Sequence, residues 1–499
     1  MKRSQAIALA LALAGGAVSI WISANLYERI PHLEDEIAFL WEAHVMAQGE
    51  IALPSPQEPR AFMVPFVIDF EGMRFGKYPP GWPAALSLGA RAGAPWAVNA
   101  LLSAVALWLI YRLGAKLINP AVGLLAELLA LSSPMFIMLS GTLLSHMLAL
   151  FLAIVVLLAW IDLTLRDAED EARKQVPRWM LIITASLALG LLILVRPLTA
   201  LGVALPLGLH GALLLVRNAP ARKQGLIIVG GIALLLAVLL PTWQAAQTGD
   251  PTLNLYTLWW EYDRVGFGAG IGNSEGGHNL LRGIGKSLRD LRSGLHNTFG
   301  WPYLSWIFLP SGFVAMKKRI GGMLLLSIFP ALVLVYVLYW AGNTLFGPRY
   351  YFASLPSLAV TSAAGIAYLG GWLAQKTKPA PWRKPLTVGL VSTLVLLNVI
   401  FYLPLRLAKM ENLYNISKER MQPLEEAALE GALVIIDAGH WSDFGTLLTL
   451  TPPFKEDGFL LAVSRGSAAD RELMAKYSNR PVFYYYADQP DTIYEAPRE

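Results

Sequence analysis

The hydrophobic and polar positions of this chain are organised on a large scale, with long apolar runs separated by shorter polar stretches. A helix that crosses the hydrocarbon core of a bilayer needs about 20 mainly apolar residues. Runs of this length predict eleven transmembrane helices, and therefore an all-α polytopic membrane domain over residues 1–405. The runs lie at 5–27, 97–117, 120–141, 143–165, 178–196, 198–217, 224–243, 298–316, 321–341, 350–375 and 385–405.

Basic residues gather near one set of the predicted span ends, as they do on the cytoplasmic side of membrane proteins. The clusters are Lys2 and Arg3; Arg112 and Lys116; Arg166, Arg173, Lys174 and Arg178; Arg217, Arg222 and Lys223; Lys317, Lys318 and Arg319; and Lys376, Lys378, Arg383 and Lys384. With eleven spans, every cluster falls on the same side, which we assign to the cytoplasm together with the N-terminus. One span more or fewer would break this agreement. The first apolar run is longer than the apolar core of a signal peptide, so we expect it to be retained.

The opposite, extracytoplasmic face then holds two long loops, at 28–96 and 244–297, and the tail from residue 406. The tail differs in character from the rest of the chain. Segments 432–438, 458–463 and 481–487 have the composition of strands, and 468–477 has that of a helix. We therefore predict a small soluble α/β domain at 406–499 that packs against the membrane domain.

Composition agrees with a chain that is solvated largely by lipid. It is 55% hydrophobic and 15% charged, where soluble domains carry about 25% charged residues. The net charge of +5 reflects the clusters at span ends and does not indicate nucleic-acid binding. The absence of cysteine excludes disulfides, thiolate metal sites and cysteine nucleophiles.

Candidate chemistry begins with three acids, Glu34, Asp35 and Glu36, that precede a stretch with helical apolar spacing at 37–44. In the simpler interpretation, Asp35 caps that helix and Glu36 is a first-turn acid that favours the helix dipole. In the functional interpretation, a carboxylate here is a general base at the membrane surface. The pattern alone leaves both open.

Three cations lie at proline-marked corners on the same face: Lys77 before Tyr78, Arg196 before Pro197, and Arg349 before Tyr350. Any one of them is explained by contact with lipid headgroups. As a set beside an acid-bearing loop, they indicate a phosphate site, because guanidinium and ammonium groups bind phosphate by charge-assisted hydrogen bonds.

Further polar candidates are Tyr78, Ser145 and His146 at junctions with spans, and the stretch Trp259-Trp260-Glu261-Tyr262-Asp263 in the second loop. They are possible contacts to a sugar, a phosphate or a metal ion, although an interfacial histidine and an aromatic belt explain them as well. The chain has no P-loop, HExxH, CxxC or GxSxG motif, so a soluble type of active site is not indicated.

At these residues the chain resembles the membrane-embedded glycosyltransferases of the GT-C fold. Within them it is most similar to bacterial relatives of the dolichyl-phosphate-mannose protein mannosyltransferases and to the lipid A aminoarabinose transferases. The resemblance covers roughly residues 1–375. The matching stretches are Asp35-Glu36, Lys77-Tyr78-Pro79-Pro80, Leu131-Ser132-Ser133-Pro134, Arg196-Pro197 and Arg349-Tyr350.

The resemblance implies an inverting transfer of a sugar from a polyprenyl-phosphate donor, as co-substrate, to a hydroxyl of a glycan, lipid or protein acceptor. It implies Asp35 as the base with Glu36 as its neighbour, and Lys77, Arg196, Arg349 and Tyr350 near the donor phosphate. Many relatives have Thr-Asp where this chain has Ser145-His146. The aspartate of those relatives is absent here, so its role in binding a metal ion or the acceptor cannot be carried over to this chain. Metal dependence therefore stays open.

Two other functions remain as alternatives. A polymerase or ligase of lipid-linked glycans would use the second loop, with Arg264, His278, Arg282 and His296. A transporter would need polar residues in mid-span. Only isolated positions such as Glu127 and Asp162 are present there, so this alternative ranks last.

Overall fold

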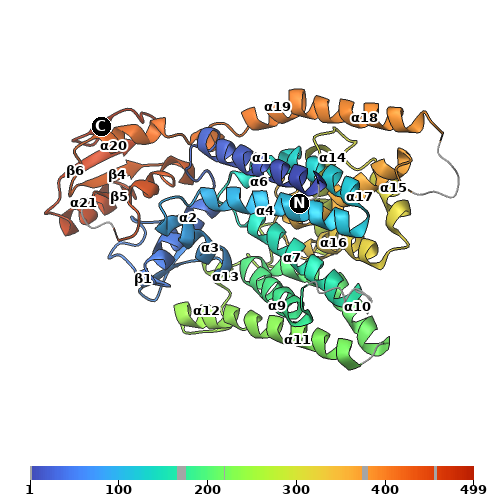
Figure 1. Ribbon diagram of the computed structural model, residues 1–499. Helices are drawn as coiled ribbons and strands as arrows, with labels where there is room; N and C mark the ends of the chain where they lie inside the picture. Colours follow the sequence, from blue (N-terminus) through green and yellow to red (C-terminus); the bar gives the residue numbers. More distant parts are fainter. Residues whose placement is uncertain (1–2, 166–175, 218–219, 374–379, 455–457, 499) are drawn as a thin grey trace.

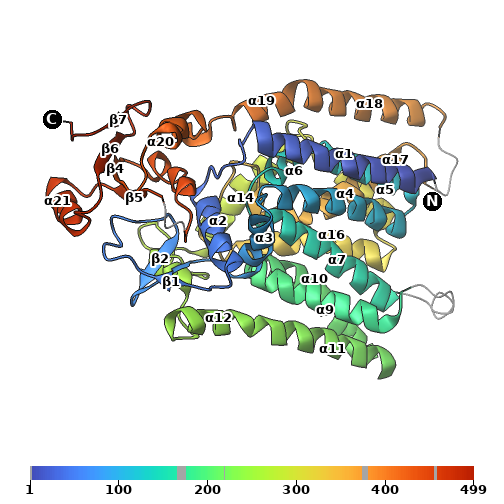
Figure 2. The same cartoon turned by 60° about the vertical axis from the view of Figure 1, so that its left-hand side comes forward.

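The computed structural model describes residues 3–165, 176–217, 220–373, 380–454 and 458–498. Long helices run side by side in one body, and the C-terminal region sits at one end of it (Figure 1). In the turned view, the segments that carry α2, α3 and the first strands lie between the long helices and the C-terminal region (Figure 2). The N-terminus lies at the opposite end from the C-terminus in that view.

Among the described residues, eight helical segments are long and apolar enough to cross a membrane. They are α1 (Arg3–Asn25), α4 (Ala97–Leu117), α7 (His146–Leu165), α9 (Arg178–Val195), α10 (Pro197–Arg217), α11 (Pro220–Ala237) with α12 (Leu239–Thr248), η1 (Arg349–Ser354) with α17 (Leu355–Leu369), and α18 (Arg383–Leu397) with η2 (Asn398–Tyr402) and α19 (Leu403–Ala408). The polytopic helical fold is therefore confirmed.

A ninth segment is a bent pair, α5 (Pro120–Leu131) and α6 (Pro134–Ser140), whose axes differ by 65°. Pro134 causes the break, because proline lacks the N–H that a continuous helix needs at that position. The backbone oxygen of Ser132 at the break accepts a hydrogen bond of 2.6 Å from the Asn398 amide. A polar group freed by the bend is thus satisfied inside the bundle, as a low-dielectric surrounding requires.

The count of eleven spanning helices is not confirmed. α16 (Ile320–Tyr336) has 17 residues, and the predicted span 298–316 contains turns followed by α15 (Leu309–Met316). An eight-residue helix rises only about 12 Å, so the expectation of a continuous helix there is wrong. The apolar pattern could not reveal this break, which follows from the left-handed backbone at Gly300 (φ +68°) and Tyr303 (φ +61°).

The segment nevertheless reaches the end of the bundle where other helices finish. Arg319 donates to the Leu117 backbone oxygen, and Gly321 lies against the side chains of Leu117 and Leu165. Lys116 forms an ion pair with Asp162 at the same end. Several of the basic residues noted above thus lie together, and their assignment to the cytoplasm stays a prediction. Lys2, Arg166, Arg173, Lys174, Lys376 and Lys378 fall outside the described residues.

The first loop is well structured at the opposite end. It contains α2 (Glu34–Ala47), where the sequence predicts a helix, and α3 (Gly81–Arg91). Between them lie β1 (Leu53–Pro54), β2 (Val67–Phe70) and β3 (Met73–Gly76), in an antiparallel sheet of order β1-β3-β2. The second loop contains α13 (Leu255–Trp259) and α14 (Leu280–Asn297), which the sequence analysis leaves as loop.

The C-terminal region has the strands and the helix that the sequence predicts. Its helical segments are η3 (Leu413–Asn415), η4 (Glu419–Met421), α20 (Gln422–Glu426), η5 (Trp441–Asp443), η6 (Leu447–Leu450) and α21 (Ser467–Lys476). Its strands are β4 (Leu433–Asp437), β5 (Leu460–Val463), β6 (Val482–Tyr486) and β7 (Ile493–Tyr494), in the order β5-β4-β6-β7. The first three are parallel, and β4 is buried on both faces, which explains its unbroken apolar run.

The C-terminal region packs against the first loop. Val463 N–H donates to the Ala61 oxygen at 2.7 Å, and the Thr446 hydroxyl donates to the Pro31 oxygen at 2.9 Å. Ile30 belongs to the same apolar core as Val434 and Leu461. These contacts hold the start of α2 between the bundle and the C-terminal sheet. That residues 406–499 form a separate soluble domain stays a prediction.

Gly300 offers a test of the non-helical backbone at the start of the segment 298–316. A Cβ there would lie 1.7 Å from Asn398 Oδ1, in a left-handed conformation that alanine adopts poorly. Gly300→Ala should lower the free energy of unfolding by about 1–3 kcal/mol, seen as a lower melting temperature in detergent. Gly230→Ala on α11, where a Cβ meets nothing within 4 Å, is the control and should be neutral or slightly stabilising. Equal melting temperatures for the two variants would contradict the backbone described at Gly300.

Candidate active site

A cavity of about 730 Å³ opens where the two long loops meet the helix ends. Five separate parts of the chain bring the predicted site residues to it: the start of α2, the turn after β3, the start of α7, the junction of α9 with α10, and η1. The predicted site residues that line it are Asp35, Lys77, Tyr78, Ser145, His146, Arg196, Arg349 and Tyr350. Glu36 and Glu261 do not line it.

Asp35 is held between two groups from distant parts of the chain. The Tyr78 hydroxyl donates to Oδ1, and Arg349 Nη2 donates to Oδ2 at 3.1 Å. The helix N-cap is Leu33, with no side-chain cap, so the interpretation of Asp35 as an N-cap is wrong. Burial raises the pKa of Asp35, but Arg349, the Tyr78 hydrogen bond and Lys77 outweigh it and hold the pKa below its usual value. The carboxylate is therefore anionic at neutral pH.

Glu36 does not line the cavity, and its carboxylate joins two backbone segments by hydrogen bonds. Oε2 accepts the His32 N–H at 2.8 Å, and Oε1 accepts the Leu143 N–H at 2.7 Å. Burial raises its pKa to about 7, against the lowering effect of these two hydrogen bonds. Its geometry is that of a positioning residue, since Leu143 leads directly to Ser145 and His146 in the cavity wall.

Glu34 is the second carboxyl group that reaches the cavity. Burial and the charge of Asp35 raise its pKa to about 7, although Lys77 acts in the opposite direction. The sequence contains all three acids in a row but cannot say which of them turn inward. That choice depends on the rotation of α2, which the packing of its apolar face decides.

Lys77 is a buried cation in an aromatic enclosure. Its ammonium lies 3.4 Å from the Phe66 ring centre and 4.7 Å from that of Trp260, and 3.9 Å from Asp263 Oδ2. Burial lowers its pKa to about 8, although Asp35, Asp263 and Glu34 favour the charged form. The aromatic rings and the carboxylates together keep a charge in a place that water cannot solvate.

Asp263 lines the cavity and belongs to the stretch 259–263 for which the sequence predicts possible sugar contacts. It accepts hydrogen bonds from the Tyr339 hydroxyl at 3.0 Å and from Trp340 Nε1 at 3.1 Å. Glu261, from the same stretch, is exposed and lies outside the cavity wall. The two acids are two residues apart in one loop, so only the tertiary contacts distinguish them.

The cationic side of the cavity is formed by Arg196 and Arg349. Arg196 Nη1 donates to the Ser145 hydroxyl at 3.1 Å, and its guanidinium lies 5.6 Å from the Tyr350 ring centre. Arg349 Nε and Nη1, and both ring nitrogens of the buried His146, have no hydrogen-bond partner within the described residues. Buried donors without partners are costly, so this wall is arranged to hold an anion.

The described residues contain no group of three or more His, Asp or Glu side chains placed to hold a metal ion. Asp35 is already shared between Tyr78 and Arg349, and His146 lies in a wall that carries two guanidinium groups. This donor set suits an anion better than a divalent cation.

The C-terminal region also contributes to the cavity wall, through Tyr414 and Trp441. Their rings lie 5.3 Å apart in an edge-to-face arrangement. Tyr414 has a φ of +59°, and Asn412 and Asn415 beside it are also left-handed. Strained backbone of this kind is typical of functional sites. Nothing in the sequence marks these residues, because the pair forms only when the C-terminal region docks.

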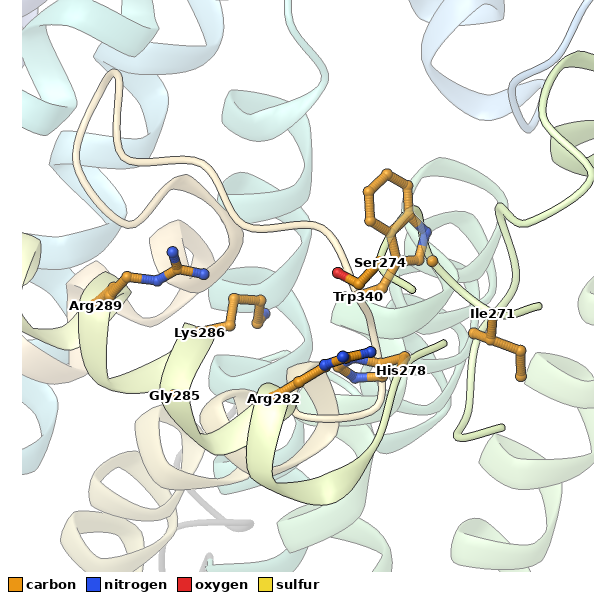
Figure 3. Close-up of a pocket in the computed structure, with 9 residues that line it drawn as sticks. Ile271, Ser274, His278, Arg282, Gly285, Lys286, Arg289 and Trp340 are labelled. Carbon is orange, nitrogen blue, oxygen red and sulfur yellow. The ribbon is translucent and has the colours of Figure 1, made fainter. Parts of the chain in front are cut away.

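A second, smaller cavity of about 400 Å³ adjoins the first and is lined by residues of α14 and the glycine-rich loop before it (Figure 3). His278 and Arg282, named for the alternative of a polymerase or ligase, line this second cavity. Arg264 is exposed and His296 packs on Tyr303, so these four residues do not converge on the main cavity.

These features define the class of structure: a polytopic helical membrane domain with a charged cavity at its helix ends, the fold of the GT-C glycosyltransferases. ArnT from Cupriavidus metallidurans, a lipid A aminoarabinose transferase whose crystal structure is bound to undecaprenyl phosphate, matches at a TM-score of 0.57 and 12% identity. The match covers 96% of this chain and 90% of ArnT.

The oligosaccharyltransferase AglB from Archaeoglobus fulgidus, in complex with an inhibitory peptide and a dolichol-phosphate, matches at a TM-score of 0.51 and 12% identity. That match covers 95% of this chain and 69% of AglB. No protein-family model matches the chain, and no curated protein matches it significantly in sequence. The expected GT-C fold is confirmed by structure, at identities too low to establish more than the fold.

Proposed function

We propose that this chain is an inverting membrane glycosyltransferase that moves a sugar from a polyprenyl-phosphate donor to a hydroxyl of an acceptor. The observation that carries the proposal is the convergence of one carboxylate, Asp35, with the cations Lys77, Arg196 and Arg349 on one cavity at the helix ends. Polyprenyl phosphates bound to ArnT and AglB, which share the fold, support a lipid-linked donor.

The cationic wall suits the phosphate of the donor. Arg349 has two free donor groups, and Arg196 and Lys77 add charge from two other sides of the cavity. These groups would stabilise the negative charge that grows on the phosphate oxygen as its bond to the sugar breaks. Apolar residues of α12 and the α9–α10 junction, Leu240, Trp243 and Leu198, line the same cavity and suit the start of a polyprenyl chain.

Asp35 would act as the base on the acceptor hydroxyl. As the acceptor oxygen attacks the anomeric carbon, the bond from that carbon to the phosphate oxygen breaks and the hydroxyl proton passes to Asp35. The polyprenyl phosphate leaves as an anion, and one displacement inverts the anomeric configuration. Arg349 contacts Asp35 directly and would thus link the base to the leaving group.

We further propose that the cavity faces the extracytoplasmic side of the cell membrane, with the N-terminus in the cytoplasm and residues 406–499 as a soluble domain outside. The support is that Lys116 and Arg319 gather at the end of α4 away from the cavity. Tyr414 and Trp441 would then form the acceptor side, beside Glu34 and Asp35. Aromatic faces of this kind bind the apolar faces of sugar rings.

Asp35→Asn tests the base. The change keeps the shape of the side chain but removes its charge, so the turnover number should fall at least about 100-fold. Protein in nanodiscs would be supplied with a panel of undecaprenyl-phosphate sugars and cell-envelope acceptors, and transfer followed by mass spectrometry. Binding of undecaprenyl phosphate should persist, whereas the melting temperature of the lipid-free protein should fall, because Arg349 loses its carboxylate partner. Undiminished transfer by this variant would remove the proposed role of Asp35.

Lys77 gives a pH test of the phosphate site. Its pKa of about 8 in the free protein means that its charge is lost as the pH rises above that value, whereas a phosphate monoester, whose second pKa is about 6, is already almost fully ionised at pH 8. Affinity for undecaprenyl phosphate should therefore decline above pH 8. Lys77→Arg remains charged at these pH values and should bind without the decline. An identical decline in both proteins would show that another group is responsible.

Trp441→Ala tests the acceptor side. Loss of one ring contact, worth about 1–1.5 kcal/mol, should raise the KM for the acceptor about tenfold and leave donor binding unchanged. Trp382→Ala, an exposed tryptophan at the start of α18, is the matched control and should leave both constants unchanged. A change in donor affinity without a change in acceptor KM would place Trp441 on the donor side instead.

A further inference from the structure

The second cavity is bounded by α14 on one side and by two loop segments on the other (Figure 3). Arg282, Lys286 and Arg289 come from the helix, and Ile271, Ser274 and Trp340 face them. Ser274, Arg289 and Trp340 also line the main cavity, so the two spaces adjoin.

Three cations occupy one face of α14. Arg282, Lys286 and Arg289 follow one another at intervals of four and three residues, which places them in a row along a helix. Lys286 is fixed by a hydrogen bond of 2.9 Å to the Tyr336 oxygen and lies 3.7 Å from Asp290, which balances its charge.

The two arginines keep their charge available. Arg282 donates from Nη1 to the Gly277 oxygen, and its other donors have no partner within the described residues. Arg289 forms no hydrogen bond or ion pair with the described part of the chain. Asp290 is buried beside Lys286, whose charge it balances, and no carboxylate lines the cavity. The cavity is therefore positive and can bind an anion.

A different face of α14 is apolar and exposed. Leu281, Ile284 and Leu288 are 79%, 42% and 61% exposed, at the spacing of one helix face. A helix with cations on one face and exposed leucines on another is typical of a helix that lies in the membrane interface. The cationic cavity would then open at the depth of lipid headgroups.

We infer that this second cavity is a binding site for the phosphate group of a membrane lipid, separate from the site of sugar transfer. Arginine binds phosphate bidentately, and Arg282 and Arg289 lie only about 10 Å apart along the helix axis. Both long side chains can therefore reach one phosphate between them. The volume of about 400 Å³ accommodates a phosphate with the first atoms of its ester, whereas a lipid tail would leave along Leu281 and Leu288. The site requires no glycosyl transfer and stands apart from the proposed function.

The simpler explanation is that any cation on an interfacial helix attracts anionic headgroups. The chain offers a matched control for it. Arg292 is on the same helix, is exposed, and does not line the cavity. Loss of Arg292 should therefore weaken non-specific attraction as much as loss of Arg282, whereas only Arg282 belongs to the cavity.

The experiment measures lipid binding to the full chain in phosphatidylcholine nanodiscs by native mass spectrometry. The probes are undecaprenyl phosphate, phosphatidic acid and undecaprenol, which lacks the phosphate. Arg282→Gln should weaken one class of phosphate-lipid binding about tenfold or more, the effect of one charged hydrogen bond. Arg292→Gln should change it less than twofold, and undecaprenol should not occupy the site.

Arg282→Gln also removes the hydrogen bond to the loop at Gly277, so a second variant is needed that blocks the cavity and keeps this bond. Gly285 lines the cavity, and a Cβ there meets nothing within 4 Å. Gly285→Phe should fill the space without a change of charge and abolish the same binding. Loss with both phosphate lipids assigns the site to phospholipid headgroups in general, and loss with undecaprenyl phosphate alone assigns it to the carrier; either supports the inference.

Equal weakening by Arg282→Gln and Arg292→Gln would overturn the inference in favour of surface charge. Full binding by both Arg282→Gln and Gly285→Phe would overturn it as well. Lys77→Gln, which alters only the main cavity, separates this outcome from the proposed function. If Lys77→Gln removes donor binding while Arg282→Gln changes nothing, the result supports the proposed function and rules out the second site.

Discussion

The arrangement of the site depends on one partly buried ion pair, between Asp35 at the start of α2 and Arg349 at the start of η1. The Arg349 guanidinium and the Asp35 carboxylate lie 3.1 Å apart and are joined across 314 residues of chain. Either charge alone would be costly in this place, because a buried charge without a partner loses its hydration. The pair therefore fixes the first loop to the helix that begins at η1. Tyr78 completes the arrangement by its hydrogen bond to the other carboxylate oxygen.

Lys77 and Asp263 form a second pair of opposite charges, which joins the two long loops. Lys77 follows the β2–β3 hairpin and Asp263 lies in the second loop, so their attraction at 3.9 Å joins two segments that the sequence separates widely. Tyr339 and Trp340, after α16, orient Asp263. The cavity is thus enclosed by charge pairs that each cross between segments. A cavity built in this way keeps some donors unpaired, as at Arg349 and His146, and those donors are available to a phosphate.

The C-terminal region extends the cavity and does not merely cover it. Its central strand β4 is buried on both faces, and the region's hydrogen bonds to Ala61 and Pro31 hold the first loop from outside. Trp441 and Tyr414 reach the cavity as a result of this docking. The cavity wall is thus made by two regions, and under the proposed function the membrane domain would supply the donor side and the C-terminal region the acceptor side.

Local patterns along the chain are enough to predict the membrane-spanning class, most span positions, the strands of the C-terminal region, and the set of charged residues that gather at one end. These follow from local periodicity and from the cost of charge in lipid, which any stretch of chain carries on its own. The tertiary contacts select Glu34 rather than Glu36 for the cavity, and Asp263 rather than Glu261 as the partner of Lys77. They also show that 298–316 is not a continuous helix, with Gly300 packed against Asn398, and that Tyr414 and Trp441 join the site. Each of these features depends on a contact with a distant part of the chain or on the rotation of a packed helix. The apolar spacing along the chain carries no information about either.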